Sequence, residues 1–405
     1  MARVCFIESC KIQSHRFCAT VASVIPARVS GVREESRILP WGRTHNGSAA
    51  GVGVAKQRIA VVGCGAVGGV IAACLTRAGN AVTPIVGNPR IETALADEGF
   101  RLYDLAGELS RIPASCSPVQ TAQQAGSIFD LVIIATPSTA LETAIKEVLP
   151  FLAPDGRIIT CQNGLPEERA TAIAGSRIVG CVVGWGATMS EPGVYKRTSS
   201  GRLQIGKACA DGPSPDDLVP ILEAVSPVEV AGDLPAVRWS KLAINCVTSP
   251  FGAIGGAPLG TLLMDAKVRR LALEVFAEVA AVARLEGIKM RPVAGTLNIT
   301  SVALSDREKQ ARWFSASLLF KHLLLLLVGF KFRRMRSSML YALERGRPIE
   351  IDFLNGEITK RGARLGFPTP VNDAIIETVR QIEQRKKSSS PLTLSEVYSR
   401  LHPSR

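Results

Sequence analysis

Three polar side chains suited to proton transfer and substrate binding are spaced four residues apart: Lys241, Asn245 and Ser249. This spacing places them on one face of a helix. The remaining positions between Trp239 and Pro250 are almost wholly apolar, which is unusual for an exposed helix. We therefore expect the polar stripe to face a cleft between domains; a solvated outer face is the alternative. An ammonium in such a cleft can stabilise negative charge on a carbonyl oxygen and supply a proton.

A second group of polar residues follows about a hundred positions later. Ser338 lies in the run Ser-Ser-Met-Leu, and Glu350 and Asp352 open a further helical pattern. Carboxylates at a helix start interact favourably with the helix dipole, so capping and catalysis are both open roles for these acids. The sequence pattern alone favours capping.

A glycine-rich turn near residue 63 predicts a dinucleotide site. The apolar run Ile59–Val62 is typical of a buried parallel strand, and a helical pattern runs over Val70–Arg77. Between them stand, in order, Gly63, Cys64, Gly65, Ala66, Val67 and Gly68. The glycines permit a tight turn, approach of a pyrophosphate to the backbone, and close packing of helix on strand. A glycine turn without a ligand is the alternative.

The end of the second expected strand, Ala81–Val86, indicates which nicotinamide cofactor is used. NAD-binding folds usually carry Asp or Glu there to hold the ribose 2′-hydroxyl. This chain instead reads Ile-Val-Gly-Asn-Pro-Arg over residues 85–90, with no acid. The missing acid favours NADP, and Arg90 could face the 2′-phosphate or simply be solvated.

Asn163 lies where open α/β sheets bind their ligands. Gln-Asn-Gly at 162–164 follows a strand expected to end near Thr160, and such sheets hold ligands beyond the carboxyl ends of their strands. The Asn163 amide offers a donor and an acceptor for a carboxamide or ribose hydroxyl. Asn-Gly is also an ordinary turn dipeptide.

These candidate residues lie on two different kinds of structure. Alternating strands and helices predict an α/β fold of Rossmann type, doubly wound, over residues 58–232, with one strand, Gly201–Gly206, expected at an edge. Residues 233–385 carry helical periodicity and predict an all-helical second domain. The expected helices are Trp239–Ser249, Asp265–Glu286, Ala316–Phe330, Arg336–Arg345, Asp352–Leu365 and Asn372–Arg385.

The two ends of the chain do not read as packed domain. Residues 1–57 are rich in Ser, Arg and Ala with few acids, which fits an organellar transit peptide, a disordered extension or a misassigned start. A cytoplasmic location is expected, or an organellar one if this leader is a transit peptide. The tail 386–405 reads as loosely ordered.

Composition excludes several classes of function. The chain has 405 residues, 46% of them hydrophobic, and no apolar run long enough for a membrane span. The net charge of +13 is spread out, with no nucleic-acid-binding motif, so we expect an anionic small-molecule partner. The ten cysteines form no CxxC pair and read as small core residues, with no metal site.

Taken together, these segments resemble the ketopantoate reductase (2-dehydropantoate 2-reductase) family. Four motifs match in order over residues 58–385: the glycine turn, Asn163-Gly164, Trp-x-Lys-Leu-x-x-Asn-Cys at 239–246, and Ser-Ser-Met-Leu followed by Glu-x-Asp-x-x-Asn-Gly. The resemblance implies NADPH-dependent reduction of 2-dehydropantoate to (R)-pantoate, on the way to coenzyme A. A homodimer is left open.

By the same resemblance, Lys241 matches the family's proton donor and Glu350 its acid near the nicotinamide. Asn245 and Ser338 match substrate contacts, and Asn163 matches a cofactor contact. Glu350 would orient Lys241 or the cofactor, while Ser249 would help to hold the substrate.

The chain departs from the family pattern in three places. Pro137 replaces a usual lysine, Ser249 replaces a usual asparagine, and the stretch between Gly287 and Ser337 is longer than in compact bacterial members. The first two departures fall in the predicted cofactor and substrate pockets. They keep open the reduction of a different 2-keto acid. A non-catalytic NADP sensor is a more distant alternative, against which the polar stripe at Lys241 argues.

Overall fold

The computed structural model describes residues 57–292, 297–310, 315–384 and 393–403, so the leader expected at 1–57 lies almost wholly outside the described residues. Its first half is a seven-stranded sheet in the order β11-β10-β7-β6-β5-β1-β2. All neighbouring pairs are parallel except β10 with β7. The strands are β1 (Arg58–Val62), β2 (Ala81–Ile85), β5 (Phe129–Ile134), β6 (Leu152–Thr160), β7 (Ile178–Val183), β10 (Leu203–Lys207) and β11 (Val228–Val230).

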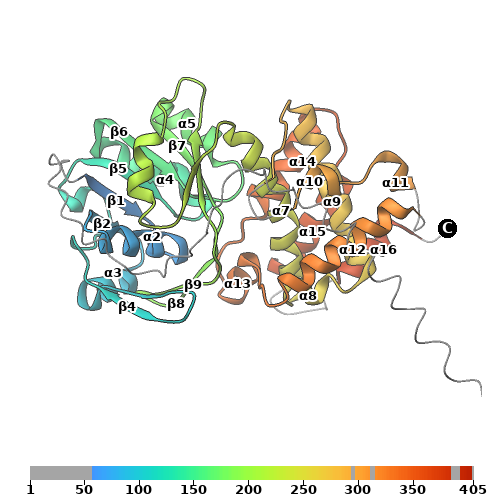
Figure 1. Cartoon of the computed structure of the whole chain (residues 1–405), viewed down its shortest axis with the longest axis horizontal. Helices are drawn as coiled ribbons and strands as arrows, with labels where there is room; N and C mark the ends of the chain where they lie inside the picture. The colour runs from blue at the N-terminus through green and yellow to red at the C-terminus, as the bar shows by residue number, and fades with distance from the viewer. Residues whose placement is uncertain (1–56, 293–296, 311–314, 385–392, 404–405) are drawn as a thin grey trace, which may run out of the picture. The chain divides into compact units, whose positions relative to one another are not determined.

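Helices cover both faces of this sheet, as the alternating pattern predicts (Figure 1). Val70, Ile71 and Leu75 of α2 pack in the core on one face. Leu141 and Ile145 of α4 pack with Ala170 of α5 on the other. The helices of this half are α2 (Ala66–Arg77), α3 (Pro89–Glu98), α4 (Leu141–Val148), α5 (Pro166–Ala174) and α6 (Val219–Leu222). The α/β, doubly wound expectation is confirmed.

A second, four-stranded sheet was not predicted. Its strands are β3 (Phe100–Tyr103), β4 (Leu109–Ile112), β8 (Ala187–Glu191) and β9 (Val194–Arg197), in the order β4-β3-β9-β8. Tyr195 of β9 is fully buried against α2, and a Cβ at Gly69 would lie 2.0 Å from its ring. The Tyr195 hydroxyl donates a hydrogen bond to the Cys64 carbonyl (3.0 Å). This sheet therefore braces the glycine turn from outside the main sheet.

The strand expected at an edge over Gly201–Gly206 is wrong in its position. The structure places it as β10, between β7 and β11. Residues 203–206 of this strand are buried. The alternation of apolar and polar residues misled because Gln204 is itself buried (3% exposed).

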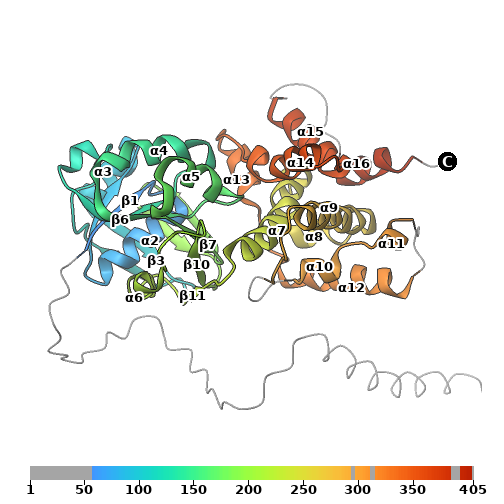
Figure 2. The same ribbon diagram turned by 90° about the horizontal axis from the view of Figure 1, so that it is seen from above.

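The second half is helical, as predicted, and its core centres on α9. Leu271, Val275, Val279 and Val282 of α9 are fully buried. In the view of Figure 2, α10 and α12 lie on one side of α9 and α14, α15 and α16 on the other. The helices are α7 (Leu234–Gly255), α8 (Leu259–Leu262), α9 (Ala266–Leu285), α10 (Ile299–Val302), α11 (Asp306–Gln310), α12 (Ala316–Lys331), α13 (Ser338–Glu344), α14 (Asn355–Arg364), α15 (Pro370–Gln384) and α16 (Leu394–Leu401).

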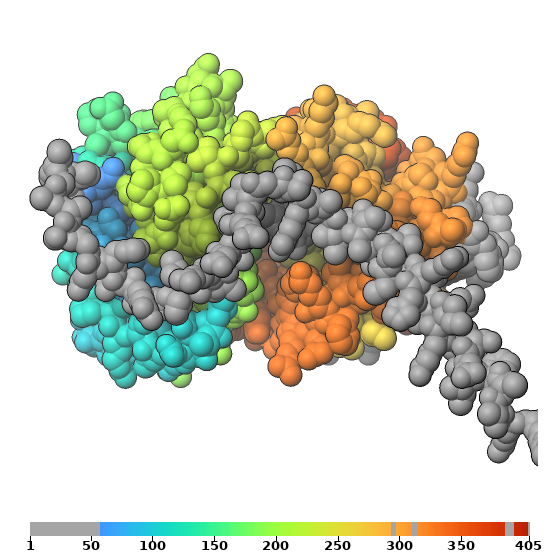
Figure 3. Space-filling view, viewed as in Figure 1, coloured from blue at the N-terminus to red at the C-terminus, as the bar shows by residue number. Residues whose placement is uncertain are grey.

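Helix α16 corrects the expectation of a loosely ordered tail for residues 394–401, while residues 386–392 and 404–405 of that tail lie outside the described residues. Thr393 and Glu396 form a reciprocal capping box at its start, and Leu394 and Val397 are buried in the helical core. Figure 3 shows the surface of the protein, with the α/β half in blue to green and the helical half in yellow to red. Among the described residues, no helix combines the length and apolar character needed to cross a membrane.

Candidate functional site

The glycine turn is tightly packed on its inner side. Gly63 has φ +86°, and a Cβ there would lie 2.8 Å from the Thr136 backbone nitrogen. A Cβ at Gly68 would lie 2.0 Å from the Gly63 carbonyl oxygen, so only glycine lets α2 begin so close to the strand. Both residues therefore serve the shape of the turn.

The outer side of the same turn is open. A Cβ on Gly65 would meet no atom within 4 Å. No side chain caps the N-terminus of α2, and its first turn holds no acid. Free amides at a helix start attract an anion, and an open backbone lets a phosphate come close. The turn fits the pyrophosphate of a dinucleotide.

The end of β2 carries no acid that could hold a ribose 2′-hydroxyl. Asn88 caps α3 by accepting a hydrogen bond from the Arg90 backbone nitrogen (3.0 Å). Glu92, the next acid along the chain, accepts a hydrogen bond from the Gln120 amide (2.7 Å). The Arg90 side chain is exposed beside this strand end.

Lys241 extends from α7 to the carboxyl end of the sheet. Its Nζ donates a hydrogen bond to the carbonyl of Val183, the last residue of β7 (2.5 Å). Burial lowers the pKa of Lys241 to about 8, with a further lowering from the charge of Arg238, while Cys181 acts the other way. The residue as a whole is partly exposed.

Arg238, which sequence reasoning missed, anchors α7 to the α/β half. It is 2% exposed and forms a buried ion pair with Glu167 of α5. Its guanidinium also donates to the carbonyls of Gln162 (3.0 Å) and Cys181 (3.1 Å). A second cation three residues before Lys241, on an otherwise apolar helix, was the signal available in the sequence.

Gln162 continues this chain of contacts to the glycine turn. Its Nε2 donates to the carbonyl of Thr136 (3.1 Å), the residue that lies against Gly63. The helix bearing Lys241 and the glycine turn are thus joined through Arg238, Gln162 and Thr136. These contacts hold the start of α7 at the carboxyl edge of the sheet, where the glycine turn also lies.

Glu350 contacts the loop that follows β5, at the carboxyl edge of the sheet. Its carboxylate accepts a hydrogen bond from the Ser138 backbone nitrogen (2.7 Å), just beyond β5. Among the described residues, Glu350 forms no hydrogen bond or ion pair with Lys241. Arg169 donates to the Ser138 carbonyl (3.1 Å) and stacks 4.5 Å above the Phe353 ring. Glu350 therefore holds the loop after β5, and orientation of Lys241 is not its observed role.

Asn163 lies in the next loop along the same edge. The following residue, Gly164, has φ +82°, and a Cβ there would lie 2.3 Å from the Phe353 carbonyl oxygen. The Asn163 loop and the segment after Glu350 are therefore in close contact. Asn163 itself is only partly buried and has no hydrogen bond to another described residue.

The remaining predicted side chains follow α7. Asn245 is partly buried and Ser249 is buried, both on the 22-residue helix that carries Lys241. Helix α13 packs beside them, since a Cβ on Gly252 would lie 2.4 Å from the Ser337 hydroxyl. Ser337 is buried and caps α13, whereas Ser338 is exposed at its first turn. Ser338 is thus the serine of the pair left available to a ligand.

Comparison with known proteins agrees with this arrangement. Residues 59–209 match the family described as ketopantoate reductase PanE/ApbA, and residues 233–383 match the C-terminal domain of that family. The 2-dehydropantoate 2-reductase of Mesorhizobium japonicum is 25% identical, covering 80% of this chain and 98% of its own. That of Archaeoglobus fulgidus is 23% identical, covering 81% and 98%.

Solved structures share the fold. The PanE/ApbA family ketopantoate reductase of Ralstonia eutropha JMP134 is 28% identical, with a TM-score of 0.68, covering 81% of this chain and 98% of its own. A D-mandelate dehydrogenase solved with NADH and anilino(oxo)acetate is 20% identical, with a TM-score of 0.67, covering 80% and 97%. The family matches span both halves of the described structure, and the chain belongs to the ketopantoate reductase family.

Proposed function

We propose that this protein reduces 2-dehydropantoate to (R)-pantoate with NADPH. The observation that carries the proposal is the attachment of Lys241 to the carboxyl end of β7, at the sheet edge that also bears the glycine turn. Family membership and the names of the curated relatives give the substrate and direction.

The protein would hold the cofactor at the turn Gly63–Gly68, with its pyrophosphate over Gly65 and the first amides of α2. When bound, NADPH supplies a hydride to the carbonyl carbon of the substrate. Asn163, partly buried beyond β6, would bind the ribose or carboxamide. Arg90 would pair with the 2′-phosphate, since no acid stands at the end of β2 to favour the 2′-hydroxyl.

Lys241 would act as the acid. Its ammonium stabilises negative charge on the substrate's carbonyl oxygen and then delivers a proton from Nζ to that oxygen. The Val183 carbonyl orients the amine, and a pKa of about 8 makes it a better donor than an ordinary lysine while leaving most of it protonated at neutral pH. Asn245, Ser249 and Ser338 would hold the carboxylate and hydroxyl groups of the substrate.

The experiment that tests this function is a steady-state assay of NADPH oxidation with a panel of 2-keto acids, repeated with NADH. We expect 2-dehydropantoate to give the highest kcat/KM, and NADPH to be preferred. Replacing Lys241→Ala should lower kcat by about 10²–10⁴, the usual range for a positioned acid.

The control is Lys267→Ala, which removes an exposed lysine that bonds Ser399 on the outside of the helical half. It should leave kcat unchanged. A higher kcat/KM for another 2-keto acid would show that this acid, and not 2-dehydropantoate, is the substrate. Ser249, where the family usually has asparagine, makes this the outcome to check. Full activity of Lys241→Ala would overturn the assignment of the acid.

A further inference from the structure

Helix α12 presents an apolar face to solvent along its whole length. Its exposed large side chains are Leu319 (70% exposed), Phe320 (43%), Leu323 (44%), Leu327 (52%) and Phe330 (70%). Leu319, Leu323 and Leu327 are spaced four apart and therefore form one stripe. No charged residue interrupts the stripe before Lys331. A contiguous apolar patch of this kind marks an interaction surface.

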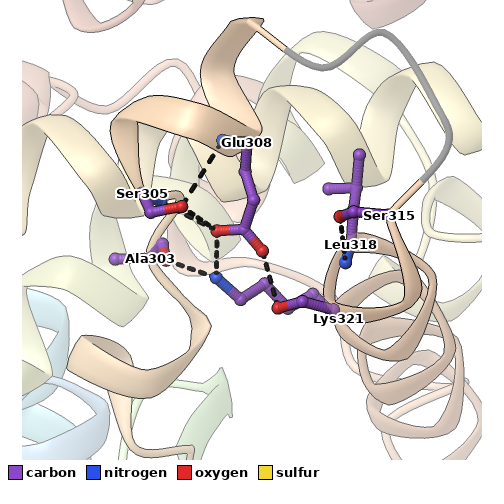
Figure 4. Close-up of polar contacts among 7 residues, drawn as sticks. Ala303, Ser305, Glu308, Ser315, Leu318 and Lys321 are labelled. Atoms are coloured by element: carbon purple, nitrogen blue, oxygen red, sulfur yellow. Dashed lines mark hydrogen bonds and ion pairs between the residues drawn. The ribbon is translucent and has the colours of Figure 1, made fainter.

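The opposite face of α12 is fixed in the helical half, so the apolar stripe has a definite direction. Lys321 is buried and pairs with Glu308 of α11 (2.7 Å), and it also donates to the Ala303 carbonyl (2.7 Å) (Figure 4). Close approach to α8 fixes the other end, because a Cβ on Gly260 would lie 2.4 Å from the Gly329 carbonyl oxygen. Rotation of α12 to hide its leucines would break both contacts.

We propose that this face pairs with α12 of a second copy of the chain, antiparallel about a two-fold axis at Leu323. That register sets Leu319 opposite Leu327 of the other copy, and Phe320 opposite Leu326. The large Phe330 then faces the small Ala316, which leaves room for its ring. Each contact occurs twice, as a two-fold interface requires.

The area of the face fits a dimer. The five exposed side chains present roughly 500 Å² at about 150–250 Å² for each fully exposed one. A standard interface buries about 800 Å² per partner around an apolar centre. Met264, 67% exposed and next to Leu263, which a Cβ on Gly329 would touch, extends the patch toward that size.

The distribution of charge favours a second copy over a lipid surface. Helices that lie on membranes carry cations along their polar flanks. The described flanks of α12 are small or apolar, and the exposed cations Lys331, Arg333 and Arg334 stand at its C-terminal end, beyond the stripe. Antiparallel pairing sends the two basic ends in opposite directions, whereas parallel pairing would bring them together at a cost in free energy.

The first experiment measures the mass of the full chain by light scattering after size-exclusion chromatography. We expect a dimer for the wild type and monomers for Leu319→Lys and Leu327→Glu, with the dissociation constant raised at least about 100-fold in each. The double variant L319K/L327E should dimerise again, because the register sets each new lysine opposite a new glutamate. Leu285→Glu, a 49% exposed leucine at the end of α9, should stay dimeric.

A second measurement guards against loss of folding in the charged variants. Leu323→Cys, on the axis, should give a covalent dimer on mild oxidation, beyond any formed by the wild type or by Leu285→Cys. A monomeric wild type, a dimer unaffected by Leu327→Glu, or a Leu323→Cys chain that fails to cross-link would each overturn the proposal. Flotation of a monomeric wild type with anionic phosphatidylglycerol vesicles would assign the face to lipid instead.

Discussion

At the scale of single residues, the chemistry depends on the different surroundings of two cations on α7, Arg238 and Lys241. Arg238 has a buried carboxylate partner, Glu167, and two carbonyl acceptors, so its charge is well compensated. Among the described residues, the Lys241 amine forms a hydrogen bond only with the Val183 carbonyl, and the positive charge of Arg238 is close enough to repel its own. The pKa of the lysine falls as a result of burial and this repulsion.

The pH dependence of kcat/KM follows from that lowered pKa. With a pKa of about 8, Lys241 of the free protein is protonated at neutral pH and loses its proton as pH rises through this value. We expect kcat/KM for reduction to be level below about pH 8 and to fall about tenfold per pH unit above it. Lys241→Arg should be slower but should show no such fall, because a guanidinium stays charged. A wild-type profile that stays level far above this pH would contradict the role of Lys241.

At the scale of elements, the unit that matters is β1, the glycine turn and α2. Its inner side is fixed by Gly63 against Thr136 and by the Tyr195 hydroxyl on the Cys64 carbonyl. Its outer side, at Gly65, is empty. Two glycines of one motif therefore have different physical tasks, one in folding and one in binding.

Alanine at these two glycines should separate the tasks. Gly65 has φ −70° and open space around it, so Gly65→Ala should leave the free energy of unfolding within about 1 kcal/mol of wild type. Its methyl group projects where the pyrophosphate would lie, and we expect KM for NADPH to rise at least about tenfold. Gly63→Ala should lose more than about 1 kcal/mol of stability, because φ is positive and the space is filled.

Urea denaturation and NADPH titration measure the two effects on each variant. Unchanged NADPH binding by Gly65→Ala would show that the pyrophosphate does not bind at this turn. If Gly63→Ala has the same free energy of unfolding as the wild type, then the positive φ and the close packing at Gly63 do not require glycine.

At the scale of the whole described structure, α5 and the loop after β5 hold the helical half against the sheet. Neighbouring acids at the start of α5 bind two different helices: Glu167 pairs with Arg238 of α7, and Glu168 pairs with Arg361 of α14 (2.6 Å). Glu350 adds a third tie through the Ser138 amide. Because Glu350 holds the loop after β5 at the sheet edge that bears the glycine turn, we expect it to act as a positioning residue for the reaction.

Substitution of Glu350 distinguishes positioning from a direct effect of its charge. Glu350→Gln keeps an oxygen that can accept from the Ser138 amide, and we expect kcat and KM within a few-fold of wild type. Glu350→Ala removes the acceptor and should lower kcat/KM about 10–100-fold, in line with about 1.5–3 kcal/mol for a hydrogen bond to a charged group. Equal losses in both variants would show that the negative charge itself is required.

Local pattern predicted most of the elements and placed the candidate site residues on them. The glycine turn, the buried strands, the long helices and the stripe of Lys241, Asn245 and Ser249 all leave a periodic or compositional trace within a few residues. The motif order also led to the family, which the comparisons confirm. The sequence by itself thus determined the α/β and helical halves and the helix that carries the predicted acid.

Only the tertiary structure decided what these elements touch. Glu350 meets Ser138 across 212 positions of the chain, and Arg238 meets Glu167 across 71. The second sheet, the inner place of β10 and the packing of α16 likewise depend on partners that no short window contains. Periodicity records which side of an element is buried, whereas the identity of the atoms that bury it, and with it the pKa of Lys241, is set by contacts between distant segments.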